Sequence, residues 1–102
     1  MLPKKLKIGG LEWKVVIGDK NFHDSTGSYA HTSFENMTIT VKELPQEDKM
    51  ASALLHEILH ACLFTTAFDR RLERLDNTLE EDMVCALAIA LSAVIRENKL
   101  QL

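Results

Sequence analysis

In this chain of 102 residues, the spacing of apolar residues differs before and after Pro45. Before Pro45, short runs of alternating apolar and polar residues are separated by residues typical of turns. After Pro45, two long runs carry apolar residues at helical spacing. Strands grouped ahead of helices are typical of an α+β domain. We therefore expect a small antiparallel or mixed sheet of three to four strands, followed by two long packed helices, in one domain over residues 1–102.

The expected elements follow from local patterns. Gly9-Gly10 favours a tight hairpin, and Met37, Ile39 and Val41 alternate with polar residues, which predicts one buried face. In chain order we expect two strands within 5–17, a loop over 18–28, strands over 29–33 and 37–41 around a turn at 34–36, a helix over 46–66, a charged connector over 68–77 and a helix over 78–98.

The second predicted helix is almost entirely apolar between its ends. We therefore expect it to be the central buried helix. Thr78, followed three residues later by Glu81, is the pattern of a capping box, so we expect this helix to begin with Thr78 as its N-cap.

Within the first predicted helix, His56, Glu57 and His60 form the pattern H-E-x-x-H. Side chains four residues apart lie on the same face of a helix, so both imidazoles can bind one zinc ion. The carboxylate of Glu57 can then reach a water on that ion. No Gly or Pro interrupts residues 46–64, which favours the helix that the motif requires. The motif predicts a zinc hydrolase with Glu57 as its general base.

A catalytic zinc usually takes a third protein ligand and keeps one position open. The longer pattern that would supply a third histidine is absent, because Leu63 and Thr66 stand where it requires Gly and His. A carboxylate near the start of the second helix is the alternative, from Glu80, Glu81 or Asp82, and helical phase does not decide among them. Cys85 is a weaker candidate. Asp76 and Asp82 are candidates to hold the second nitrogen of a ligand histidine.

Composition and charge exclude several other classes. The formal net charge of −3 gives no basic surface for nucleic acid. Residues 83–95 are the longest apolar run and are too short to span a membrane. The first residues lack the apolar run of an export signal, and the two cysteines read as buried thiols. We therefore expect a cytoplasmic protein with no nucleic-acid or membrane partner.

Three stretches of the chain resemble one family. The run 54–61 around the motif, the later run 80–87 and the hairpin 7–11 are similar to small zincin-like metallopeptidases of phages and prophages, related to the ImmA/IrrE metallo-endopeptidase group. The resemblance implies a minimal gluzincin-like fold with zinc bound by His56, His60 and a second-helix glutamate. By position in the family pattern Glu81 is favoured, with Glu80 as the alternate.

We therefore expect a zinc-dependent metallo-endopeptidase that hydrolyses peptide bonds in a protein or peptide substrate through a zinc-activated water. The developing oxyanion would be stabilised by zinc, with Tyr29 or His31 as further donors or substrate contacts. An exposed edge strand in this region could hold a peptide by β-augmentation. Whether a second copy or a regulatory protein takes part is left open.

Two other functions fit the same residues. In the first, zinc only holds the two helices together, in an interaction module of phage or prophage origin that cleaves nothing. Glu57 argues against this function, because a structural site has no use for a carboxylate that binds no metal. In the second, the chain binds no metal and pairs with a partner through its apolar second helix.

Overall fold

The computed structural model describes residues 2–18 and 29–99, and most of the loop predicted over residues 18–28 lies outside them. In chain order the elements are β1 (Lys5–Ile8), β2 (Leu11–Gly18), β3 (Ala30–Ser33), β4 (Thr38–Lys42), α1 (Glu47–Thr65), α2 (Phe68–Leu75) and α3 (Leu79–Glu97). The four strands form one mixed sheet in the order β1-β2-β4-β3, with the helices after it in the chain. The α+β arrangement expected from the sequence is confirmed.

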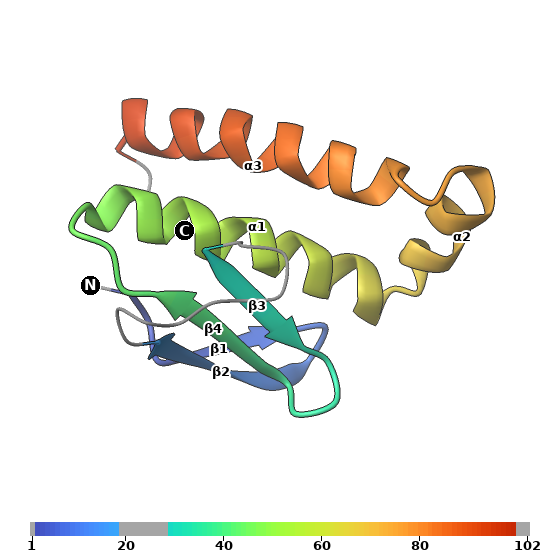
Figure 1. Ribbon diagram of the computed structural model, residues 1–102, viewed down its shortest axis with the longest axis horizontal. Coiled ribbons are helices and arrows are strands. Elements are labelled where there is room, and N and C mark those ends of the chain that lie inside the picture. The colour runs from blue at the N-terminus through green and yellow to red at the C-terminus, as the bar shows by residue number, and fades with distance from the viewer. Residues whose placement is uncertain (1, 19–28, 100–102) are drawn as a thin grey trace.

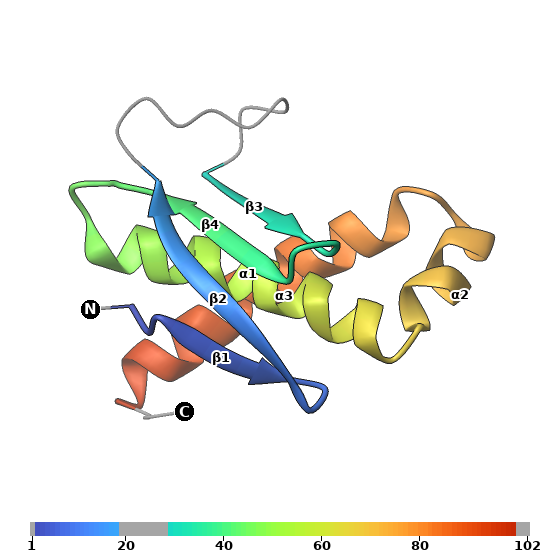
Figure 2. The same cartoon turned by 90° about the horizontal axis from the view of Figure 1, so that it is seen from below.

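The elements form three layers, with the sheet on one side, α1 in the middle and α3 outermost (Figure 1). Seen from below, the sheet lies across α1, and α2 joins the two long helices at one end (Figure 2). Among the described elements, α3 contacts α1 and α2 but no strand. The prediction that this apolar helix is the central one is wrong, because α3 buries only Val84 and Ala88.

The β1–β2 hairpin is fixed by its two glycines. Ile8 pairs with Leu11 across the turn, and Gly9 and Gly10 have φ angles of 60° and 79°, which favour glycine. A Cβ on Gly9 would lie 2.8 Å from the Cβ of Thr65 at the end of α1. The missing side chain therefore lets the hairpin press directly against the motif helix.

The core lies between the sheet and α1. Trp13, Ile39 and Val41 are fully buried, and the alternation predicted for β4 is confirmed, because Thr38, Thr40 and Lys42 are more exposed. Helix α1 contributes Leu54 and Ala61 to the same cluster. Burial of these apolar side chains contributes roughly 1.5–3 kcal/mol for each large one, and it fixes the orientation of α1 on the sheet.

The charged connector between the long helices, for which the sequence allowed partial helix, forms the helix α2. The capping box predicted at Thr78 is not formed, since the Thr78 side chain caps no backbone N–H. Instead Asp76 accepts hydrogen bonds from the backbone N–H of Thr78 at 2.9 Å and from its hydroxyl at 2.8 Å. Asp76 thus organises the turn that leads into α3.

No single helix within residues 2–18 and 29–99 is long and apolar enough to cross a membrane. Helices α1 and α2 pass that test only when taken together, across a bend of 96°.

Candidate metal centre

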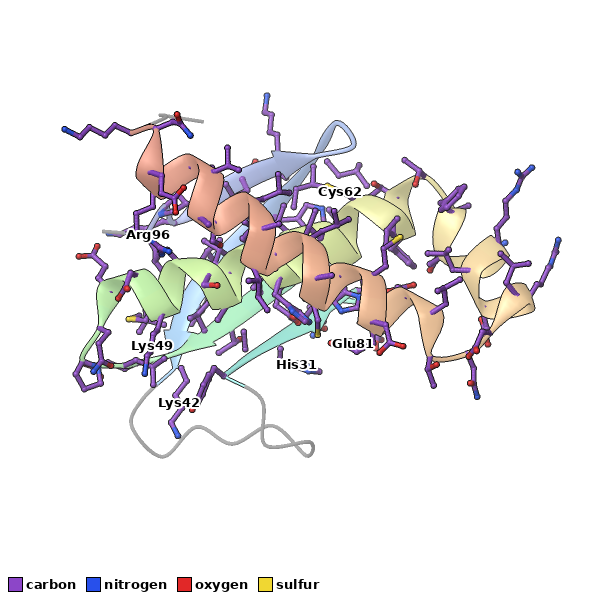
Figure 3. All side chains as sticks on the ribbon, turned by 90° about the horizontal axis from the view of Figure 1, so that it is seen from above. His31, Lys42, Lys49, Cys62, Glu81 and Arg96 are labelled. Carbon is purple, nitrogen blue, oxygen red and sulfur yellow. The ribbon has the colours of Figure 1, made fainter. Side chains whose placement is uncertain are left out.

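The histidine pair of the motif lies on the face of α1 that meets α3. Its ring centroids are 5.0 Å apart, as expected for residues four positions apart on one helix. Helix α3 runs beside α1 (Figure 3). Its first turn brings Glu80 and Glu81 against this pair. The acids sit at a helix N-terminus, where the macrodipole stabilises negative charge.

Side chains of three residues surround one point between the helices. The Nε2 atoms of His56 and His60 are 3.2 Å apart. Glu81 places one carboxylate oxygen 2.8 Å from the His56 Nε2 and the other 3.0 Å from the His60 Nε2. A tetrahedral zinc ion about 2.0–2.1 Å from each ligand sets its ligands about 3.3–3.4 Å apart. The observed separations of 2.8–3.2 Å are shorter than that range, so the ligand atoms would have to move apart by about 0.1–0.6 Å to admit the ion.

The two glutamates have different partners on the same ring. Glu80 Oε2 accepts a hydrogen bond from Nδ1 of His60 at 2.5 Å, while Glu81 faces Nε2 of that ring. A carboxylate on the second nitrogen is a common feature of histidines that bind metals. Neither Asp76 nor Asp82, the candidates named from the sequence, fills this position. Glu81 is therefore the candidate ligand, and Glu80 holds the ring.

The electrostatics of the cluster favour a cation. When Nδ1 of His60 carries the proton donated to Glu80, its Nε2 presents a lone pair. Burial raises the pKa of Glu81, but the hydrogen bond from Cys85, the charges of His60 and His56 and the hydrogen bond with His60 outweigh burial, so this pKa lies below its ordinary value. The charges that lower this pKa are those of protonated imidazoles. When both rings are neutral, their Nε2 lone pairs and the Glu81 carboxylate form a His2Glu donor set that suits zinc.

Glu57 belongs to the same site but is held differently. Its Oε1 accepts a hydrogen bond of 2.9 Å from the hydroxyl of Thr32 on β3. Its Oε2 lies 3.8 Å from the His56 Nε2, farther than either oxygen of Glu81 lies from its histidine. The Glu57 side chain is 12% exposed and that of Glu81 is 58% exposed. The arrangement keeps Glu57 beside the ligand set without making it the nearest carboxylate.

Cys85 lies one turn after Glu81 and donates its thiol hydrogen to Glu81 Oε1 over 3.3 Å. Burial, together with the hydrogen bond to Glu81 and the charges of Glu81 and Asp82, raises the pKa of this thiol. In the described part of the chain, the ligand atoms of His56, Glu81 and Cys85 lie within 4.8 Å of one another. The protonated thiol supports Glu81 rather than competing with it. Both cysteines are exposed, contrary to the prediction that they are buried.

The two predicted oxyanion or substrate contacts lie in different places. Tyr29 is half exposed and lines a groove with His56, Glu57 and Glu81. His31 is exposed and alternates along β3 with Ala30 and Thr32, which are buried on the helix side. Strand alternation therefore directs His31 to the opposite face of the sheet. The structure brings Tyr29 to the site and not His31.

Two cavities meet at Glu81. A groove of about 530 Å³ runs between α1, α3 and the start of β3, and its walls include Ala53, Ala88 and Ile89. A smaller cavity of about 280 Å³ lies on the α2 side of the site and is lined mainly by acids. Both cavities are thus lined in part by Glu81 of the candidate ligand set.

Sequence reasoning missed Thr32, and it gave no separate role to Glu80. Alternation along the predicted strand would have grouped Thr32 with Ala30 on the inner face, but nothing in the sequence pairs it with Glu57. The sequence shows Glu80 only as a second acid beside Glu81. The separate role of Glu80 depends on the angle between α1 and α3, which the sequence does not give.

Comparisons of the chain with known protein families, with curated proteins and with solved structures each found no match.

Proposed function

We propose that this chain is a zinc-dependent peptidase that hydrolyses peptide bonds. One observation carries the proposal. His56, His60 and Glu81 surround a common point at distances suited to zinc, while a separate carboxylate, Glu57, is held beside that point by Thr32. A site that only binds a structural metal has no need for Glu57, because the ligands alone complete such a site.

A zinc ion bound by His56, His60 and Glu81 supplies Lewis-acid chemistry, lowering the pKa of a water to about 7 and polarising a carbonyl group. Glu57 acts as the general base that accepts a proton and later returns it to the leaving amine. The Thr32 hydroxyl occupies one oxygen of Glu57 and leaves Oε2, the oxygen nearer His56, for proton transfer. Glu80 keeps a proton on Nδ1 of His60 and so keeps Nε2 available for the metal.

The position of β3 supports a peptide as the substrate. β3 is an edge strand of the sheet, and it carries Thr32, the residue bound to Glu57. Lys42 donates its backbone N–H to the carbonyl of Tyr29, so in this antiparallel pair the backbone groups of Ala30 and Thr32 point to the free edge. An extended peptide can pair with that edge and pass beside Glu57. Tyr29, at the end of the strand, is placed to contact it.

The resemblance to small phage and prophage zincin-like peptidases related to the ImmA/IrrE group is part of this proposal. It agrees with the assignment of His56, His60 and Glu81 as ligands. The compartment, the protein substrate and a regulatory partner are proposals too, and of these the resemblance supports the protein substrate.

Metal content tests the first half of the proposal. The full chain, purified without chelators and analysed by mass spectrometry of its metals, should carry about one zinc per chain. His56→Ala with His60→Ala should carry none, while His31→Ala, an exposed histidine on the other face of the sheet, should keep it. A wild-type protein that binds no zinc when supplied with it would overturn the proposal.

Peptide cleavage tests the second half. A zinc-loaded wild-type protein should cleave members of a peptide library, and Glu57→Gln should lose this activity by about 10²-fold or more while keeping its zinc. Glu35→Gln, in the exposed turn before β4, is the matched control and should behave as wild type. Identical cleavage profiles for wild type and Glu57→Gln at equal zinc content would instead favour the zinc-stabilised interaction module.

A further inference from the structure

The outer face of α3 is apolar and uncovered. Residues 83–95 contain no charged side chain, yet Ile89 is 70% exposed, Val94 47% and Leu87 42%. Seen from above, α3 lies uppermost along its whole length (Figure 3). Monomers seldom expose contiguous apolar patches larger than a few hundred Å², and larger patches commonly mark interfaces.

Leu87 and Val94 lie about 140–160° around the helix from Ile89, whereas one line of residues through Ile89, the seam, has heptad spacing. Asp82, Ala86, Ile89, Ala93 and Arg96 follow one another at intervals of four and three residues, the spacing of a and d positions in paired helices. Four of the five are exposed and Ala93 is half-buried. The two alanines flank Ile89 and leave room on each side, so a neighbouring helix can approach closely and receive Ile89 between its own side chains.

The charges at the ends of the seam identify the partner. Asp82 lies seven residues before Ile89 and Arg96 seven residues after it, on the same line of the helix. At 1.5 Å per residue each charge stands about 10 Å from Ile89 along the axis. If a second α3 crosses in the antiparallel direction with a two-fold axis near Ile89, Asp82 of each copy meets Arg96 of the other. Within the described residues, neither Asp82 nor Arg96 forms an ion pair in its own chain.

We propose that two copies of this chain form an antiparallel dimer through the seam Asp82–Ala86–Ile89–Ala93–Arg96 of α3. The order acid, apolar, base is complementary to itself under a two-fold rotation, as an isologous interface requires. The apolar side chains supply most of the affinity, and the two ion pairs set direction and register. An interface of one helix per copy lies at the small end of stable interfaces, so the dimer dissociates in the micromolar range.

The dimer also bears on the groove beside the metal centre. Ile89 belongs both to the seam and to the wall of that groove. The second copy therefore stands at the rim of the groove. This inference does not depend on zinc or on peptidase activity, because it is carried by α3 residues that bind no metal.

Sedimentation velocity of the full chain, from about 1 µM to a few hundred µM, measures the association directly. Wild type should shift from monomer to dimer across this range. Ile89→Asp should need at least tenfold higher protein concentration than wild type to dimerise. Val16→Asp replaces another exposed apolar residue, on β2, and should dimerise as wild type. Because Ile89 is mostly exposed, circular dichroism should show that Ile89→Asp remains folded. A wild type that is monomeric throughout, or a dimer insensitive to Ile89→Asp, overturns the proposal.

A charge exchange tests the direction of the helices. Asp82→Arg and Arg96→Asp should each weaken self-association at least tenfold, because each places like charges opposite one another. An equimolar mixture of these two variants should form a heterodimer, and the variant carrying both changes should dimerise as wild type. Absence of association in the mixture, with both variants folded, excludes the antiparallel arrangement.

Discussion

Glu80 and Glu81, consecutive on α3, reach opposite nitrogens of the single imidazole of His60. Glu80 accepts from Nδ1 at 2.5 Å, and Glu81 lies 3.0 Å from Nε2. Neighbouring helix residues point about 100° apart, and the ring of His60 enters between the two side chains. Two acids that the sequence offered as alternatives therefore both contact the same histidine.

Substitution of each acid should separate these roles. Glu81→Gln should abolish tight zinc binding, because it removes the charged ligand shared with His56. Glu80→Gln should keep one zinc per chain but weaken affinity about 10- to 100-fold, because His60 loses the carboxylate that orients it. Competition against a chromogenic chelator measures both affinities. Equal losses for the two variants would contradict the division of roles.

Thr32 should act on catalysis without acting on the metal. Thr32→Val keeps the shape of the side chain but removes the donor to Glu57, so kcat/KM for peptide cleavage should fall about tenfold or more, the equivalent of a charged hydrogen bond. Zinc content should not change. Thr32→Ser, which retains a hydroxyl, should recover most of the loss. A Thr32→Val enzyme with wild-type kinetics would show that Glu57 needs no such support.

Cys85 should prove dispensable for metal binding. Cys85→Ser keeps a donor to Glu81 and removes the sulfur, so zinc affinity should stay within a few-fold of wild type. Cys62→Ser, at the other exposed cysteine, is the control for general effects of removing a thiol. Loss of stoichiometric zinc in Cys85→Ser alone would identify the thiolate as a ligand.

The two hairpin glycines should differ in their tolerance of a side chain. Both have positive φ angles, so alanine at either should cost about 1–2 kcal/mol of unfolding free energy. Gly9→Ala should cost more than Gly10→Ala, because its Cβ meets Thr65, whereas Gly10 faces open space. Chemical denaturation of both variants measures the difference. Equal losses would mean that the hairpin moves away from α1 without penalty.

Asp76 should make folding sensitive to acid. Hydrogen bonds from the backbone N–H and then the hydroxyl of Thr78 lower the pKa of Asp76 despite slight desolvation. Because this pKa is lower in the folded than in the unfolded chain, the stabilisation is complete above about pH 4 and disappears as the pH falls through the folded value. The melting temperature of wild type should exceed that of Asp76→Asn at pH 6, and the difference should shrink toward pH 3. A difference independent of pH would exclude the charge as its source.

Local patterns in the sequence were sufficient to predict most of the elements. Gly9-Gly10 marked the hairpin, alternation marked β4, and the run after Pro45 marked α1 within one residue at each end. The order of the layers was not predictable from such patterns. The apolar composition of α3 indicates that another surface covers this helix. Composition does not say whether that surface is the sheet or a second molecule.

Only the part of the site that lies on one helix, α1, was predictable from the sequence. The spacing of His56 and His60 follows from helical geometry, so their convergence needed no knowledge of the fold. Glu81, Glu80 and Thr32 reach the site from other elements, and their roles depend on how α3 and β3 lie against α1. His31 shows the same limit, because one step along β3 moves a side chain from the site to the opposite face.

The outermost position of α3 has a consequence for how the molecule opens. This helix touches no strand among the described elements and fully buries only two of its own residues, so its docking rests on contacts with α1 and α2. A metal ion bound by His56, His60 and Glu81 would bridge α1 and α3, and its binding free energy would add to the docking of α3. Metal loss would then favour local opening, in which α3 separates from α1 while the sheet and α1 keep their shared core.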